Sequence, residues 1–215
     1  MTVIHIILSN ICIGNIKNIK KKFLKNYISF NYNNFNYLNI KKIIINLYLI
    51  KNYLKKILND KKKILFVNTN NFLKEIIYKY SRSLEQYYIC NKLIGGVLTN
   101  SKNFKKNLNK SIILKKKRLQ NFTKKEKNIF LKKEKKIEFL YGGLKNMVKK
   151  PDLIFLTDIK KDKIIINEAK RLNIKIFALI DTDINIKNID FFIPCNNNSI
   201  NCVKYIFKIL FSEIC

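Results

Sequence analysis

Glycine and histidine are scarce in this sequence, and their scarcity limits the chemistry that it can support. The 215 residues include five glycines and a single histidine, His5. The glycines stand at positions 14, 95, 96, 142 and 143, so they cannot form the Gly-rich loop that holds phosphate in many nucleotide-binding proteins. The single histidine lies in a terminal segment that we expect to be loosely ordered, which argues against a Ser-His-Asp triad, and one histidine cannot form a metal site made of several histidines. We therefore expect no nucleotide cofactor and no hydrolytic catalysis.

Tryptophan is absent, and arginine occurs only as Arg82, Arg118 and Arg171. Lysine, asparagine, isoleucine, tyrosine and phenylalanine are abundant instead, which indicates an A/T-rich genome because these residues have A/T-rich codons. The chain has five cysteines, and no two of them form a Cys-x-x-Cys pair. An odd number without that spacing is typical of reduced, buried thiols rather than of a disulfide framework.

Acidic residues are also few: 14 Asp and Glu stand against 44 Lys and Arg, which gives a formal net charge of +30. A charge of this size favours a polyanionic partner, with nucleic acid first and an anionic membrane second. The excess is uneven, because residues 101–150 hold 18 basic and 3 acidic side chains, whereas residues 151–215 hold 9 and 8. Codon bias explains part of the lysine excess, but it does not explain this asymmetry.

The apolar N-terminal segment, residues 1–14, is too short to span a bilayer and lacks the basic lead of a signal peptide. It also lacks the Arg-rich and Ser-rich composition of an organellar transit peptide. If the protein works in an organelle, we expect it to be made there.

The stretch 151–183 has the pattern of a strand, a helix and a second strand. Two short apolar runs, at 153–157 and 174–180, flank a segment in which apolar residues recur at helical spacing: Ile164, Ile165, Ala169 and Leu172. Strands that are apolar on both faces are typical of a parallel sheet covered on both sides. The crossover between such strands is nearly always right-handed. We therefore expect an α/β domain with a doubly wound parallel sheet.

The rest of the chain adds elements to this sheet. Residues 1–26 form a poorly ordered basic arm in our interpretation, and two short strands follow around Asn33-Asn34, a pair that can form a tight turn. Asn39 is expected to cap a helix that ends near residue 60. Further strands are expected at 64–67, 87–90 and 191–193, the last of them stopped by Pro194. Three apolar stripes mark helices: Ile40, Ile43, Ile44, Leu47, Leu54, Ile57 and Leu58; Phe72, Ile76, Ile77 and Tyr80; and Ile200, Val203, Ile206, Phe207 and Leu210.

Residues 101–148 have the pattern of a helical hairpin. Phe104, Leu108, Ile112 and Leu119 give the first arm an apolar seam, and Ile137, Leu140, Leu144 and Met147 follow heptad spacing in the second. Thr123 and Glu126 have the spacing of a capping box, which starts the second arm. The hairpin can be an ordinary solvated coiled coil, but its lysine excess favours an RNA-binding arm. The chain then divides into four segments: the arm 1–26, a first part of the α/β domain at 27–100, the hairpin 101–148, and a second part at 149–215.

Several motifs occur in an order that identifies a family. They are ILFVNTN, NKLIGGVLTN, FTKKE, YGGLKNMVKKPDLIFLTD, NEAKRLNIKIFALIDTD and IDFFIPCNNNSI. Over residues 27–210 the chain resembles the bacterial and organellar small-subunit ribosomal protein two family. The segment Tyr27–Ile40 resembles the family's Tyr-Ile…Asn-Gly…Asp-Leu segment, with Asn34 in place of glycine. Two departures stand out: Lys92-Leu93-Ile94 replaces the family's Arg-Trp-Leu before Gly95-Gly96, and the family's His-Phe-Gly-His is reduced to 12–15, Cys-Ile-Gly-Asn.

The resemblance implies a five-stranded flavodoxin-like sheet with an inserted coiled-coil hairpin, in a structural ribosomal protein that catalyses nothing. It implies binding to small-subunit ribosomal RNA between the head and body of the subunit, beside neighbouring ribosomal proteins. We expect no cofactor, no small-molecule substrate, no membrane association and no homo-oligomer. The A/T bias and the absent transit peptide favour a plastid ribosome of the apicoplast kind, with a mitochondrion or a reduced bacterial endosymbiont as alternatives.

The candidate RNA-binding residues lie in the arm, in the loop before the hairpin and on the hairpin. They are Lys20, Lys21, Lys22, Lys92, Asn100, Lys102, Lys105, Lys106, Lys115, Lys116, Lys117, Arg118, Lys124 and Lys125. A free RNA-binding maturation factor and a membrane-surface protein are the rival functions. Asp181-Thr182-Asp183 could hold Mg²⁺ at a strand end, although capping and turn formation fit this segment better.

Overall fold

The computed structural model describes residues 11–16, 26–33, 35–118, 122–147, 149–181 and 188–212. Its main sheet has five parallel strands in the order β5-β4-β6-β7-β8. These strands are β4 (Ile64–Val67), β5 (Tyr87–Ile89), β6 (Leu153–Leu156), β7 (Lys175–Ile180) and β8 (Phe191–Pro194). The first strand of the sheet thus lies between the second and the third, which is the flavodoxin-like doubly wound order. The expected fold class is confirmed, and β4, β6 and β7 lie side by side at its centre.

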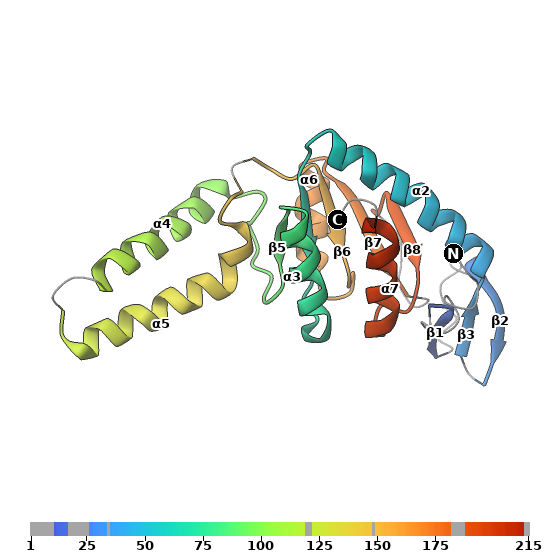
Figure 1. Ribbon diagram of the computed structural model, residues 1–215, viewed down its shortest axis with the longest axis horizontal. Coiled ribbons are helices and arrows are strands. Elements are labelled where there is room, and N and C mark those ends of the chain that lie inside the picture. The colour runs from blue at the N-terminus through green and yellow to red at the C-terminus, as the bar shows by residue number, and fades with distance from the viewer. Residues whose placement is uncertain are drawn as a thin grey trace.

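Helices cover both faces of this sheet (Figure 1). One face packs against α2 (Ile40–Asn59), α3 (Lys74–Ser83) and α7 (Ile200–Phe211). The other face packs against α6 (Lys163–Arg171) and against the residues at the base of the hairpin. Because both faces are covered, all four residues of β4 and all four of β6 are buried, which is why these strands are apolar throughout.

A row of phenylalanines crosses the first face at one register level. Phe66, Phe155, Phe177 and Phe191 are successive partners across four neighbouring strands. The ring centroids of Phe66 and Phe155 are 5.2 Å apart, and those of Phe155 and Phe177 are 4.5 Å apart. Phe207 of α7 packs on the centre of this row, with its ring centroid 4.9 Å from that of Phe155. These aromatic contacts fix α7 on the sheet, since such pairs add to the energy of burial.

In each of two predicted helix faces, one residue lies outside the core. In α6, Ile165 and Ile166 are buried, whereas Ile164 is 51% exposed. Phe72 was predicted to face the core, but it is 73% exposed and Leu73 is buried instead. The reason is a short 3-10 helix, η2 (Asn71–Leu73), which is capped by the side chain of Asn70 and precedes α3. Its tighter winding changes the phase of the residues that follow.

A second, antiparallel sheet in the order β1-β3-β2 lies at the end of the domain opposite the hairpin (Figure 1). It consists of β1 (Ile13–Ile16), β2 (Ile28–Tyr32) and β3 (Phe35–Leu38). The expectation of a poorly ordered arm is therefore wrong for residues 11–16, where Ile11 is buried and the carbonyl of Cys12 accepts a hydrogen bond from the amide of Leu38 at 2.8 Å. Residues 17–25, with Lys20, Lys21 and Lys22, lie outside the described residues.

Several local predictions for the chain are confirmed. The side chain of Asn39 caps α2 by accepting the amide hydrogen of Lys42. Asn33 has a φ of 44°, the positive value that the tight turn requires. Cys12, Cys90, Cys195 and Cys202 are buried free thiols, and Cys215 lies outside the described residues.

Pro194 does not stop the last strand but belongs to it, paired with Ile180. An edge strand tolerates proline because one side of its backbone has no neighbour to receive a hydrogen bond. Within the described part of the chain, no helix is both long and apolar enough to cross a bilayer.

The phenylalanine row generates a stability prediction. Phe155 is fully buried and contacts rings on both neighbouring strands and on α7. Phe155→Ala is therefore expected to lower the free energy of unfolding by about 3–5 kcal/mol, through lost burial and an unfilled cavity. Urea denaturation of the variant and the wild type measures the difference. Phe72→Ala, at an exposed position, is the matched control and is expected to change stability by less than about 0.5 kcal/mol.

Candidate nucleic-acid interface

The hairpin consists of α4 (Ser101–Arg118) and α5 (Lys124–Tyr141), and it extends away from the sheet on the side of β5 (Figure 1). The predicted capping box starts α5: the Thr123 hydroxyl accepts the amide hydrogen of Glu126, and the Glu126 carboxylate accepts that of Thr123 at 3.0 Å. The Thr123 hydroxyl also donates to the Glu126 carboxylate at 2.7 Å. This hydrogen bond and the one from the Thr123 amide hold the pKa of Glu126 below its usual value. Local sequence therefore determines where the second arm begins.

The seam between the two arms is apolar at its base and mixed further out. Phe104 is buried with its ring 5.6 Å from that of Tyr141, whose hydroxyl accepts a hydrogen bond from the side chain of Asn107. Ile112 was predicted to lie in the seam, but it is 55% exposed. Further along α4, the ammonium of Lys115 lies 3.8 Å from the carboxylate of the buried Glu134. The seam thus changes from packed rings to an ion pair, and the apolar stripe predicted for the first arm misplaced Ile112.

Between the arms lies an open groove of about 400 Å³ with an apolar floor and basic rims. Its floor is formed by Ile113, Leu114, Phe130 and Ile137, and its rims by Lys110, Lys117, Lys133 and Lys136. All four lysines are exposed. Two come from each arm, so lysines of both helices line one open groove. The hairpin lysines are therefore arranged as a surface that can follow a line of phosphates.

The other candidate residues lie on the surface of the same half of the molecule. Lys92, Lys102, Lys105, Lys106, Lys116, Lys124 and Lys125 are exposed, as is Asn100 in the loop that leads into α4. Lys117 lines the groove, and Lys115 is paired with Glu134. Arg118 ends α4, and its side chain is not among those described.

A buried carboxylate ties the hairpin to the α/β domain. Glu168 of α6 accepts hydrogen bonds from the backbone amides of Gly96, Leu98 and Thr99 at 2.6, 3.0 and 3.3 Å. This loop leads directly into α4. Gly96 has a φ of +85°, a left-handed conformation that glycine adopts without steric strain. The family-like Gly-Gly motif therefore serves to shape a loop around a carboxylate.

The C-terminal end of α5, at the base of the hairpin, packs directly on the backbone of the sheet. Gly143, in the short helix η3 (Gly142–Leu144), comes so close to β5 that a Cβ there would lie 2.2 Å from the carbonyl oxygen of Tyr88. The side chain of Asn91 donates to the carbonyl of Phe139 at 2.6 Å. The segment before α4 and the segment after α5 are thus both anchored to the domain. Lys92 follows Asn91 in the first of these segments.

Comparison with known proteins agrees with this geometry. The family model described as ribosomal protein S2 matches residues 6–215. The chain is 54% identical to the small ribosomal subunit protein uS2 of Carsonella ruddii over 216 positions that cover all of both chains. It is 36% identical to uS2 of Baumannia cicadellinicola over 155 positions, which cover 70% of this chain and 67% of that protein. A uS2 from Rickettsia canadensis is 37% identical over 66% of this chain and half of its own length.

The chain belongs to the ribosomal protein S2 family. It is a structural constituent of the small ribosomal subunit and not an enzyme. The resemblance drawn from the ordered motifs is therefore confirmed. Membership also accounts for the basic excess of residues 101–150, which hold 18 basic and 3 acidic side chains, since the family implies binding to ribosomal RNA.

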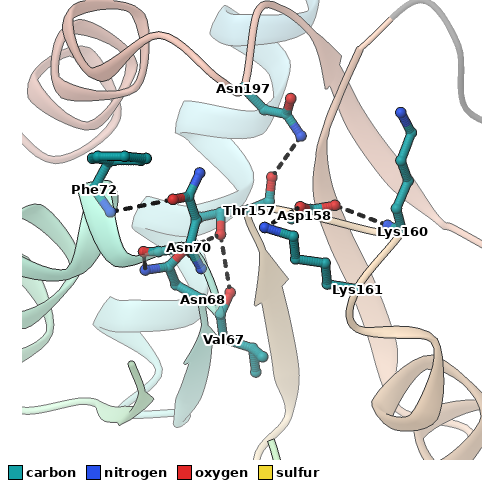
Figure 2. A network of polar contacts seen from close by, with 9 residues as sticks. All are labelled: Val67, Asn68, Asn70, Phe72, Thr157, Asp158, Lys160, Lys161 and Asn197. Carbon is teal, nitrogen blue, oxygen red and sulfur yellow. Dashed lines mark hydrogen bonds and ion pairs between the residues drawn. The ribbon is translucent and has the colours of Figure 1, made fainter. Parts of the chain in front are cut away.

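In doubly wound enzymes a ligand binds at the carboxyl ends of the strands, where the strand order reverses. In this S2 protein that place lies between β4 and β6, and it is filled by hydrogen bonds among side chains (Figure 2). Asn68 donates to the carbonyl of Asn70 and accepts from the Thr157 hydroxyl, both at 2.8 Å. Asn197 donates to the Thr157 carbonyl at 3.0 Å. Three loops are thus joined by amides and a hydroxyl, in a place where a nucleotide site would need free backbone amides.

Asp162, at the start of α6, is a buried charge near these loops. It is fully buried, and neither of its carboxylate oxygens has a hydrogen-bond partner among the described residues. Burial raises the pKa of Asp162 from 3.8 to about 7. The Thr69 side chain favours the charged carboxylate and so lowers this pKa, but by less than burial raises it.

The structure offers no support for a cation at Asp181. Asp181 is buried, and Asp183 lies outside the described residues. The described residues contain no group of three or more His, Cys, Asp or Glu side chains able to hold a metal ion.

Sequence reasoning missed four residues of this interface. Lys110, Lys133 and Lys136 rim the groove, and Glu168 anchors the loop before it. The seven-residue spacing of Lys110 and Lys117, and the three-residue spacing of Lys133 and Lys136, place each pair on one helix face and could have identified the rims. No local pattern could identify Glu168, because its partners lie about 70 residues away.

The Glu168 contacts predict a specific loss of order at the hairpin base. Glu168→Ala leaves the amides of Gly96, Leu98 and Thr99 without acceptors and is expected to lower the free energy of unfolding by about 3 kcal/mol. Glu168→Gln keeps one acceptor oxygen, so a loss of roughly half that size is expected. Hydrogen exchange of the three amides measures the local effect, and urea denaturation the global one. Wild-type protection of these amides in Glu168→Ala would contradict the assignment.

The raised pKa of Asp162 predicts that pH affects stability. Because the folded protein binds the Asp162 proton more tightly than the unfolded chain, stability is highest below the unfolded pKa of about 4 and falls as pH rises toward about 7. Asp162→Asn removes this charge and can donate to the buried Thr69 hydroxyl. Its advantage over wild type in urea denaturation is expected to grow between pH 4 and pH 8, to roughly 2–4 kcal/mol. An advantage that does not change with pH would count against a buried, titrating Asp162.

Proposed function

We propose that the hairpin binds small-subunit ribosomal RNA through the groove between α4 and α5. The observation that carries this proposal is the placement of Lys110, Lys117, Lys133 and Lys136 on facing rims of one open groove. Lysine suits this role because it is a compact point charge that binds phosphate without the geometric demands of arginine. Contacts of this kind position a protein on RNA without reading sequence. Lys92 and the other exposed candidate lysines extend the same basic surface toward the α/β domain.

The charge distribution supports the hairpin as the main RNA contact. Residues 101–150 contain 18 basic and 3 acidic residues, whereas residues 151–215 contain 9 and 8. We propose that the segment 101–148 is an RNA-binding insertion and that the parts at 27–100 and 149–215 hold it in place. The arm that carries Lys20, Lys21 and Lys22 remains a second candidate for phosphate contact.

Neighbouring ribosomal proteins are proposed as the partners of the opposite end of the molecule. There, Phe30 and Tyr32 of β2 are 58% and 61% exposed, and Ile45, Tyr48 and Leu49 of α2 are 57–66% exposed. Exposed apolar side chains of this size mark surfaces that are covered in an assembly. We propose that the protein occupies the subunit as a single copy and does not form a homo-oligomer.

The source of the ribosome is inferred from the relatives. A full-length match at 54% identity is with a protein of Carsonella ruddii, a reduced endosymbiotic bacterium. We infer that this chain also comes from the small subunit of such a bacterium, the third of the sources that the sequence left open. Codon bias favoured a plastid source, but the three relatives reported above are bacterial proteins.

The groove predicts how RNA binding depends on salt. Replacing its four rim lysines by glutamine is expected to weaken binding to small-subunit ribosomal RNA. It is also expected to reduce the slope of log K against log salt by about 3–4, since each lost phosphate contact reduces the slope by roughly 0.7–0.9. Filter binding at several salt concentrations measures both quantities. The variant is also expected to leave the small subunit at lower salt in a sucrose gradient.

The matched control replaces four exposed lysines of the α6 and α7 region: Lys161, Lys163, Lys204 and Lys208. It removes the same charge, so its affinity and slope are expected to change much less if the hairpin makes the contacts. If the control loses affinity and slope while the groove variant keeps both, the RNA surface has been assigned to the wrong part of the molecule. A wild-type protein that is found off the ribosome would instead favour a maturation factor.

A further inference from the structure

A second pocket lies outside the groove, at the base of the hairpin. It has a volume of about 440 Å³, within the range of roughly 300–1,000 Å³ that small ligands occupy in proteins. Three elements form its walls: α3 through Lys74, Glu75 and Tyr78, β5 and the following residues through Tyr88, Cys90 and Asn91, and the end of α5 through Glu138 and Phe139. This pocket shares no lining residue with the groove between α4 and α5.

Two aromatic rings at the pocket are exposed, and each has a cation over one face. Phe139 is 54% exposed, and the ammonium of Lys74 lies 5.3 Å from the centre of its ring. Tyr78 is 42% exposed, and the guanidinium of Arg82 lies 5.0 Å from the centre of its ring. Exposed aromatic rings beside basic groups are the combination by which proteins bind unpaired nucleotides, with bases stacked on rings and cations on the phosphates.

The inner wall of the pocket is rigid and uncharged. Tyr88 stands edge-on to Tyr78, with ring centroids 5.4 Å apart. Burial raises the pKa of the Cys90 thiol to about 12, and burial, with a further contribution from Tyr78, raises the pKa of Tyr88. Both groups therefore stay protonated at neutral pH. The close approach of Gly143 to the Tyr88 backbone holds this wall against the end of α5.

Polar groups at the rim can distinguish a base from a plain aromatic ring. Glu138 forms an ion pair with Lys145, so its charge is balanced. Asn91 is held by its bond to the Phe139 carbonyl, and Glu75 adds a second carboxylate to the lining. Carboxylate and amide oxygens accept hydrogen bonds from the amino and imino groups on base edges. Lys74 is the cation in the lining itself, and two more lie beside lining residues: Arg82 over the ring of Tyr78, and Lys145 at Glu138.

We propose that this pocket receives one unpaired nucleotide of small-subunit ribosomal RNA, with its base stacked on Phe139 or Tyr78 and its phosphate beside Lys74 or Arg82. The inference rests on the proposed RNA binding of the hairpin and extends it from phosphate contact to the capture of a single base. Lys74 covers Phe139 in the free protein, and such an exposed contact is weak enough for a base to displace. The released ammonium is then in reach of the phosphate.

An RNA nucleotide fits the pocket better than two other occupants. An apolar protein side chain would match the rings, but it would add no anion beside Lys74 and Arg82 in a chain of net charge +30. A free mononucleotide would have to bind without the rest of the RNA. In RNA, the phosphates already bound along the hairpin hold the base near the pocket and raise its effective concentration.

The test compares Phe139→Ala with wild type for binding to small-subunit ribosomal RNA at several salt concentrations. Loss of one stacked base is expected to weaken binding about tenfold and to leave the salt slope unchanged, because no charge is removed. Phe139→Tyr keeps the ring and is expected to bind as wild type. Phe72→Ala, which removes a 73% exposed ring outside the pocket, is the matched control and is expected to bind as wild type. Thermal denaturation of each variant confirms that it folds.

Chemical probing of the RNA bases gives a second readout. One nucleotide is expected to be protected in the wild-type complex and reactive in the Phe139→Ala complex. Wild-type affinity and an unchanged base pattern in Phe139→Ala would overturn the proposal, even where the groove variant confirms phosphate binding by the hairpin. Normal RNA binding combined with failure to enter a reconstituted subunit would also overturn it and would make the pocket a protein-docking site. Saturable binding of AMP or GMP without RNA would assign the pocket to free nucleotides instead. If wild type itself shows no salt-dependent RNA binding, it is the proposed function that fails.

Discussion

The buried carboxylate of Glu168 connects the part of this protein that folds around a sheet to the part that projects from it. Its oxygens accept the amides of Gly96, Leu98 and Thr99, and the loop that they organise runs directly into α4. Because α6 is packed on the sheet through Ile165 and Ala169, the position of the loop follows from the position of the core. An arm that must present lysines at fixed places needs such a rigid base, since its own seam has few buried side chains.

Other scarce acidic residues are used in the same way. Only 14 of the 215 residues are acidic, and several of them accept backbone amides at the junctions of elements. Asp152 accepts the amide of Lys63 at 2.9 Å, and Asp190 accepts that of Ile176 at 2.8 Å. Asp158 accepts the amide of Lys160 in a turn, and Glu126 accepts that of Thr123 at the start of α5. Carboxylates in these roles stabilise the chain locally, whereas the lysines of the hairpin have little opposite charge nearby. The positive field is therefore concentrated where RNA is proposed to bind.

The sheet was largely predictable because its strands are short, apolar on both faces and separated by amphipathic segments. Ile64–Val67, Leu153–Leu156 and the run in Lys175–Ile180 could be assigned, and so could their adjacency at the centre. The faces of the helices on the sheet were predicted correctly except near the first turns, where Phe72, in the 3-10 turn, and Ile164 are exposed. Periodicity gives the face of a long helix well, but it cannot place the first turn of a short one.

The sequence by itself determined the family, the order of the elements and the segment that carries the charge, because ordered motifs, hydrophobic period and composition are properties of the chain alone. The tertiary structure alone decided which lysines share a surface, since Lys110 and Lys133 become neighbours only when α4 folds back on α5. It also decided the partners of Glu168 and the pocket beside Phe139, which bring together residues from three separate elements. These groups meet because long-range packing of the hairpin base on β5 and α6 is driven by non-directional burial of apolar surface, which leaves no local pattern in the sequence.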